Sequence, residues 1–202
     1  MPQSITSQIL ARIYGRGRGW AFSPKDFSEF SRPEDALREL AKAGTIRRAI
    51  RGIYDYPRYS DLLKKPLSPD IHQVAKALAR KFGWNIVPDS ASAMNLIGLS
   101  TQVPSQYVYL SDGPKRTYKI GKTELAFRHI APKEIKFKHE ESGIIVHALK
   151  GLGEARIDNN TIKQIRDWLP ADMRPKVRSD AARVTEWVLH AIQRITQESA
   201  NG

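Results

Sequence analysis

The sequence contains no cysteine and no long apolar run. The absence of cysteine from its 202 residues excludes disulfides and thiolate metal sites, and it is compatible with a reducing compartment. No apolar segment approaches the roughly 20 residues that a helix needs to span a bilayer, and the N-terminus lacks a basic-then-apolar signal sequence. We therefore expect a cytoplasmic protein that is not inserted in a membrane.

Acidic residues are scarce relative to basic ones. The 33 Lys and Arg residues exceed the 21 Asp and Glu residues, which gives a net charge of +12 and a pI near 10.0. By segment, basic and acidic residues number 11 and 6 in residues 1–60, 14 and 8 in residues 61–150, and 8 and 7 in residues 151–202. Fixed positive charge attracts polyanions and releases their counterions. Charge alone does not separate DNA from RNA or an anionic membrane.

Signatures of enzyme chemistry are also missing. The sequence has no GxxxxGK[ST], GxSxG or GxGxxG motif, and its five histidines follow no metal-ligand spacing. The alternative that stays open is a metal-dependent nuclease, with Asp112 and the segment Glu134-Ile135-Lys136 as the acidic residue and the Glu-x-Lys pair. Such a pair arises by chance in a chain with 27% charged residues. We therefore expect no catalytic activity, no cofactor and no bound metal.

Residues 22–57 carry the most informative pattern. Ser23 is a favourable N-cap with Pro24 at the first helical position, which predicts a helix that buries Phe27 and Phe30. A second helix follows, because Ser31-Arg32-Pro33-Glu34 fits a capping box. Its apolar face is formed by Ala36, Leu37, Leu40 and Ala41, and its opposite face by Ser31, Arg32, Asp35, Arg38, Glu39 and Lys42. This pattern predicts a helix-turn-helix whose second helix enters the major groove.

A basic β-hairpin is expected directly after the second helix. Ile46 and Ile53 flank Arg47, Arg48 and Arg51, and Gly52 lies near the expected tip. Two close helices followed by such a hairpin are the order of a winged helix-turn-helix. The alternative is a small helical domain with solvated charges.

The segment before this motif adds a helix and a basic loop. Residues 3–14 place isoleucines at helical spacing, so a first helix is expected beneath the motif. Residues 15–20 read GRGRGW and include Arg16 and Arg18. The segment is expected to be a flexible basic arm that reaches a minor groove or phosphates, or else a solvated loop. Trp20 and Phe22 are expected to anchor this segment to the core rather than stack on bases.

Residues 57–69, with three prolines, predict a boundary between a DNA-binding domain at 1–60 and a second domain at 61–202. Helices are expected over residues 68–82, 90–99, 143–152, 158–169 and 180–197, and strands over 84–87, 106–110, 117–120 and 124–130. The last three strands suggest a meander. The predicted fold class is α+β, a winged helix-turn-helix followed by a mixed α/β domain whose small antiparallel sheet is flanked by helices.

Several segments resemble one known family. In order along the chain they are FSPKDF, LRELAKAGTIRR, RGIYDYP, SAMNLIGLSTQVP, YLSDGPKRTYKIG and LAFRHIAP. This order is similar to the AbiEi-type antitoxins of bacterial type IV toxin-antitoxin systems, over roughly residues 5–170. The resemblance implies a protein that represses its own operon by binding inverted repeats in the promoter. It also implies an antitoxin that counteracts a nucleotidyltransferase-like toxin without a stable complex.

In that family, the recognition helix corresponds to residues 32–43 and the wing to residues 45–54. We expect phosphate contacts from Lys25 and the wing arginines, and base contacts from Arg32 or Arg38. The full set of expected DNA-binding residues is Arg16, Arg18, Lys25, Arg32, Arg38, Lys42, Arg47, Arg48 and Arg51.

Two questions about partners stay open. We expect one protomer on each half-site, as a monomer or as a dimer that forms on the DNA. A protein-binding module that docks directly on the toxin is the remaining alternative, with the helical stripe around Trp187 and Val188 as its surface. A stripe at that spacing is more often core. The basic residues Lys115, Arg116, Lys119 and Lys122 either form a second nucleic-acid surface or keep the domain in solution.

Overall fold

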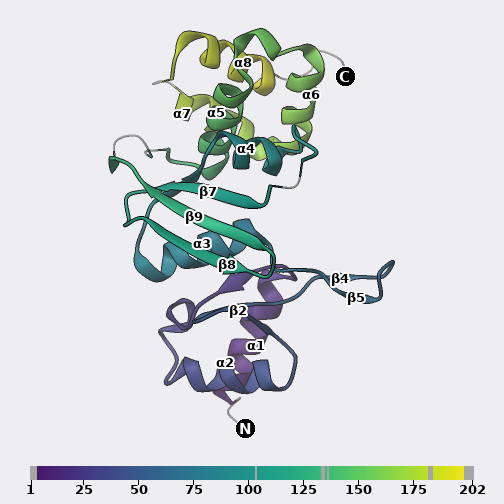
Figure 1. The fold of residues 1–202 in the computed structure, drawn as a ribbon, viewed down its shortest axis with the longest axis vertical. Helices are drawn as coiled ribbons and strands as arrows, with labels where there is room; N and C mark the ends of the chain where they lie inside the picture. The colour runs from purple at the N-terminus through teal and green to yellow at the C-terminus, as the bar shows by residue number, and fades with distance from the viewer. Residues whose placement is uncertain (1–3, 103, 133–134, 136, 182–183, 198–202) are drawn as a thin grey trace. The chain divides into compact units, whose positions relative to one another are not determined.

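The computed structural model describes residues 4–102, 104–132, 135, 137–181 and 184–197. Over these residues the protein is α+β, as predicted, with eight α-helices, short 3₁₀ turns and three small β-sheets (Figure 1). The chain divides into two compact units. The first comprises residues 1–84 and 117–125, and the second comprises residues 85–116 and 126–202.

The first unit begins with the elements that the sequence pattern indicated. They are α1 (Ile5–Arg16), β1 (Ala21–Phe22), the 3₁₀ turn η1 (Pro24–Phe27), α2 (Pro33–Lys42), β2 (Arg47–Ile50), β3 (Ile53–Asp55), β4 (Tyr59–Ser60), β5 (Lys65–Pro66) and α3 (Ile71–Phe82). Residues 117–125 add most of β8 (Arg116–Ile120) and the start of β9 (Thr123–His129). The predicted boundary after residue 60 falls inside this unit, because α3 packs against β1, β3 and η1.

One apolar cluster joins α1, β1, η1, α2 and Ile46, the residue before β2. Its fully buried members include Ile9 and Ile13 from α1, Phe27 from η1 and Leu37 from α2. Phe22 and Phe27 pack edge to face, with ring centroids 5.5 Å apart, and Trp20 packs on both. The prediction that Trp20 and Phe22 anchor their segment to the core is confirmed.

The first predicted helix of the motif is shorter than expected. It is one turn of 3₁₀ helix, in which Ser23 and Asp26 form a capping box, and Phe30 is only half buried. The capping box predicted at Ser31 is wrong, because Arg32 occupies the N-cap of α2 in a left-handed conformation with φ of 50° and no side-chain cap.

Two antiparallel sheets lie within residues 21–66. The first has the strand order β1-β3-β2, with β3 in the centre, and the second is the two-stranded hairpin of β4 and β5. The predicted hairpin over residues 45–54 is confirmed as β2 and β3, and Gly52 supplies the positive φ of 76° at its tip. The hairpin of β4 and β5 occupies part of the predicted linker, and its two-residue strands are too short to show alternation in the sequence.

The remaining sheet has the order β6-β7-β9-β8, where β6 is Ile86–Pro88 and β7 is Gln106–Ser111. The strands were predicted near their observed positions, but the predicted meander is wrong. In a meander, β8 would pair with β7, whereas β9 lies between them. Turn signals locate strands but do not state which strands pair.

Helices supply most of the second unit. They are α4 (Ser90–Ile97), α5 (Glu140–Leu152), α6 (Asn159–Trp168), α7 (Arg174–Asp180) and α8 (Glu186–Thr196). The helix predicted over residues 180–197 begins only at Glu186, and α7 was not predicted. Val188 of α8 is fully buried and Trp187 packs against the same core cluster, so the stripe around these residues is core in this structure. Within the described residues, no helix is both long and apolar enough to cross a membrane.

Candidate nucleic-acid interface

Helix α2 exposes a continuous polar face on the first unit. Its apolar side chains, among them Leu37 and Leu40, are buried against α1 and η1, which leaves the opposite face to solvent. Every residue predicted on that face is exposed: Ser31, Arg32, Asp35, Arg38, Glu39 and Lys42. The predicted amphipathicity of this helix is therefore confirmed.

The charges on this face are not equally available. Arg38 donates to the Asp35 carboxylate at 3.1 Å, one turn earlier, but its side chain is 75% exposed. Such an exposed pair is worth little and exchanges with solvent or a ligand at low cost. Among the residues that the structure describes, no hydrogen bond or ion pair engages the side chains of Arg32 and Lys42. The face therefore presents three cations, one of which is held by an acidic neighbour.

The three arginines of the β2–β3 hairpin have different environments. Arg48 and Arg51 are exposed, and within the described chain neither side chain has a hydrogen bond or an ion pair. Arg48 pairs in register with Tyr54, which packs against the core cluster shared by α1 and α2. Because residues paired directly across two strands project from the same face of the sheet, Arg48 lies on the helical side of the sheet.

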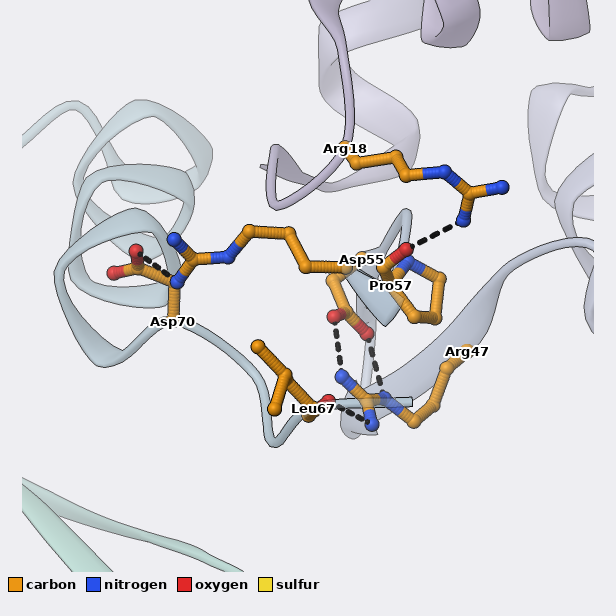
Figure 2. Close-up of polar contacts among 7 residues, drawn as sticks. Arg18, Arg47, Asp55, Pro57, Leu67 and Asp70 are labelled. Carbon is orange, nitrogen blue, oxygen red and sulfur yellow. Dashed lines mark hydrogen bonds and ion pairs between the residues drawn. The ribbon is translucent and has the colours of Figure 1, made fainter. Parts of the chain in front are cut away.

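Arg47 is held inside the fold. Its guanidinium donates to both oxygens of Asp55, at 3.0 and 2.6 Å, and to the carbonyl oxygen of Leu67 at 2.8 Å (Figure 2). The Asp55 side chain is only 2% exposed. A buried carboxylate requires such a partner. Arg47 therefore serves the structure of the hairpin, and we leave it out of the candidate interface.

The hairpin tip gathers further cations. A Cβ on Gly52 would lie 2.5 Å from the Lys81 Nζ, and Lys25 Nζ donates to the carbonyl oxygen of Lys81 at 3.3 Å. Lys25, Lys81 and the tip residues Arg51 and Gly52 are thus neighbours. Lys81 is not among the DNA-binding residues expected from the sequence, because α3 follows the predicted domain boundary and no local pattern relates it to the hairpin.

The segment of residues 15–20 is not a free arm. Arg16 ends α1 and lies over the Trp20 ring, with 5.7 Å to the ring centroid. Arg18 donates to the carbonyl oxygen of Pro57 at 2.8 Å (Figure 2). Its guanidinium also lies 4.6 Å from the Tyr56 ring centroid. The Gly19 N–H donates to the Tyr56 carbonyl at 2.6 Å. These contacts fix a tight turn, so the predicted flexible arm is wrong, although both arginines stay exposed.

A small hollow of about 240 Å³ adjoins this turn. Aromatic, proline and arginine residues form most of its wall, and its lining is Tyr14, Arg18, Gly44, Thr45, Tyr56, Pro57, Arg58, Tyr59 and Pro66. Both arginines of the wall are engaged, since Arg58 donates to Asp70 at 3.0 Å. A hollow this small lies below the usual volume of a small-molecule site.

The residues of the nuclease alternative are only partly described. Asp112 accepts from the backbone and side-chain amides of Asn85, at 2.8 and 2.7 Å, so both of its oxygens are engaged. Glu134 and Lys136 lie outside the described residues. Within the described part of the chain, His, Asp and Glu residues form no group of three that is suited to a metal ion.

Two ionisable groups of the second unit are perturbed, and both shifts have structural causes. Burial lowers the pKa of His147 below its ordinary 6.5, the nearby Lys150 lowers it further, and Asp89 partly opposes both. The imidazole is therefore neutral at pH 7. The Thr161 backbone N–H lowers the pKa of Asp158, which is the N-cap of α6. The basic residues Lys115, Arg116, Lys119 and Lys122 are all exposed.

Comparison with known proteins gives a family and one structural likeness. The sequence matches the family described as a family of unknown function, DUF6088, over residues 8–177. No curated protein matches the chain. Among solved structures it is similar to the RV2827C protein from Mycobacterium tuberculosis, with 11% sequence identity and a TM-score of 0.40, over 96% of this chain and 78% of that chain. These descriptions state no activity.

Proposed function

We propose that this chain, which belongs to the family of unknown function DUF6088, is a winged-helix DNA-binding protein that represses its own operon. The observation that carries the proposal is that one compact unit holds both the exposed basic face of α2 and the exposed arginines Arg48 and Arg51 of the β2–β3 hairpin. Duplex DNA is the polyanion whose major groove accepts such a helix.

The order of elements supports a winged helix-turn-helix. Helix α1, strand β1, turn η1, helix α2 and the β2–β3 hairpin follow one another in the first unit, and β3 pairs with both β1 and β2. This order is that of a helix-turn-helix with a following wing, in which η1 stands for the supporting helix. A single 3₁₀ turn is sufficient for that role here, because Phe27 fixes it in the core.

Within this proposal, the contacts divide by position. Phosphate contacts, which do not depend on the base sequence, would come from the wing arginines Arg48 and Arg51 and from Lys25 and Lys81 near the wing tip. Arg32, Arg38 and Lys42 belong to the recognition helix, where an arginine reads guanine through two hydrogen bonds. Asp35 on the same helix holds Arg38, and the carboxylates of Asp35 and Glu39 disfavour close phosphates.

The antitoxin role completes the proposal and rests on the family resemblance alone. Repression of the operon and neutralisation of a nucleotidyltransferase-like toxin are what the resemblance to AbiEi-type antitoxins implies. The presence of a nucleotidyltransferase gene next to this reading frame would support this part, and rescue of growth when the two proteins are expressed together would test it. Absence of rescue, with DNA binding intact, leaves a repressor that is not an antitoxin.

Binding to two duplexes tests the DNA-binding part. The whole chain is titrated against a labelled fragment from upstream of its own reading frame and against a random duplex of equal length. We expect R48A/R51A to weaken binding to both duplexes by about ten-fold or more, because two phosphate contacts are lost. Arg38→Ala is expected to lower the preference for the upstream fragment.

A charge-matched control separates a specific surface from the net charge. K163A/K176A removes two exposed cations from α6 and α7. This variant is expected to bind as the wild type does. Equal weakening by both double variants would contradict the proposed surface, because binding would then follow total charge only.

A further inference from the structure

The β4–β5 hairpin carries two leucines whose side chains are exposed to solvent. Leu62 is 92% exposed and Leu63 is 55% exposed, and both lie in the turn between the strands (Figure 1). Leu62 has the largest exposed fraction among the large apolar residues of the described chain. An isolated exposed apolar residue is ordinary on a protein surface. Two adjacent leucines at the end of a projecting hairpin form a local apolar tip.

The base of this hairpin is held firmly, although the tip is free. Arg47 of β2 donates to the Leu67 carbonyl oxygen (Figure 2). The Leu67 N–H donates to the Arg58 carbonyl at 2.8 Å. Arg58 in turn pairs with Asp70, the N-cap of α3. A two-stranded hairpin by itself is marginally stable in water. These anchors therefore allow the fold to present residues 61–64 away from the body of the unit.

The turn is also ordered by its own contacts. The Leu63 N–H donates to the Ser60 hydroxyl at 3.1 Å, and Lys64 adopts a left-handed conformation with φ of 48°. A non-glycine residue in this conformation is strained and is often found at functional sites. These two features define the backbone path of the turn that carries the leucines.

The charged residues beside the leucines favour a negatively charged ligand for the tip. Lys64 and Lys65 follow the leucines directly, and Asp61 is the single carboxylate of the turn. Through Arg47, the hairpin also joins the strand that carries Arg48. Architectural DNA-binding proteins insert apolar side chains between base steps from the minor groove while neighbouring basic residues contact phosphates.

We propose that Leu62 and Leu63 form a wedge that enters the DNA minor groove and unstacks a base step, with Lys64 and Lys65 on the flanking phosphates. This inference rests on the proposed DNA-binding function and adds a second contact to it. The wedge favours flexible steps such as TA, because these unstack at low cost. It would therefore contribute to the choice of operator without hydrogen bonds to the bases.

The test uses the full chain and a duplex of about 20 base pairs, roughly two helical turns, with a central TA step. The adenine of that step is replaced by 2-aminopurine, whose fluorescence rises when the base unstacks. Wild-type protein is expected to raise this fluorescence on binding. L62A/L63A is expected to bind about ten-fold more weakly and to give no rise at saturation.

Two control variants distinguish the wedge from other effects. Ile5→Ala removes an exposed apolar side chain from α1, where Ile5 is 39% exposed, and is expected to behave as the wild type does. R48A/R51A is expected to weaken binding but to keep the full fluorescence rise at saturation. Because Leu62 and Leu63 are exposed, L62A/L63A should melt at the wild-type temperature.

The outcomes separate the wedge from the proposed function. If R48A/R51A weakens binding but L62A/L63A matches the wild type in affinity and fluorescence, the wedge is wrong and DNA binding stands. If the wild type does not bind the duplex, both proposals fail. A leucine variant that changes only the sedimentation of the free protein would also overturn the wedge, because the tip would then bind a second copy of the chain.

Discussion

Adjacent residues of the same type have different roles in this protein. Arg47 and Arg48 are neighbours on β2, yet Arg47 neutralises the buried Asp55, whereas Arg48 is exposed. The alternation of a strand sends the two side chains to opposite faces, and only one of those faces holds a buried carboxylate. In a list of basic residues the two are equivalent, but in the fold only Arg48 is available to a ligand.

A second residue-level feature, the backbone conformation of Arg32, leads to a testable prediction. Its φ of 50° at the N-cap of α2 is unfavourable for a residue with a Cβ, whereas glycine adopts it without strain. We expect Arg32→Gly to raise the free energy of unfolding by about 0.5–1 kcal/mol in urea denaturation while it weakens duplex binding. Arg32→Asn should act in the same direction, since asparagine tolerates this conformation. A loss of stability in both variants would show that the Arg32 side chain has a structural role.

At the scale of elements, the β-ribbon depends on one ion pair. Arg47 joins β2, β3 and the residue after β5, so its loss affects both hairpins. The turn η1 depends on distant contacts in the same way, because Asp26 caps the turn and also pairs with Arg80 of α3 at 2.6 Å. Short elements of this kind are stable only through contacts with residues far along the chain.

Arg47→Ala is therefore expected to destabilise the fold rather than to remove a DNA contact. The Asp55 carboxylate would be left buried without its partner, at a cost of about 3 kcal/mol in the free energy of unfolding. Arg48→Ala should change it by less than about 0.5 kcal/mol. R47A/D55A should recover part of the loss, as a double-mutant cycle in urea would measure. An unchanged stability in Arg47→Ala would contradict the structural role.

At the scale of the whole molecule, charge is widely distributed, but we propose a local interface. The net charge of +12 favours a polyanion before any specific contact forms. Only contacts that displace phosphate counterions set the slope of log K against log salt. The number of contacts can therefore be measured separately from the overall charge.

We expect the salt slope to become shallower by about 2 in R48A/R51A, since each lost phosphate contact changes it by roughly 0.9. K163A/K176A should leave the slope unchanged, although it alters the net charge equally. The measurement is duplex affinity at several salt concentrations. Equal changes in slope for both variants would favour a diffuse electrostatic association over the proposed surface.

The sequence by itself determined the local features of the fold. Apolar periodicity located α2, α3, α5 and α6 to within a few residues, and glycine signals marked the tip of the β2–β3 hairpin. The exposed face of α2 followed from the same periodicity, because residues 3 and 4 apart share one side of a helix. These properties depend on near neighbours along the chain.

Only the tertiary structure decided which cations are available and which elements pair. It placed β9 between β7 and β8 and packed α3 against the N-terminal elements. It also fixed the turn that contains Arg18 through a hydrogen bond to the Pro57 carbonyl oxygen. It also assigned Arg47 to Asp55 and brought Lys81 to the hairpin tip. Each of these contacts joins residues that no local pattern relates, because burial and pairing depend on which segments meet in space.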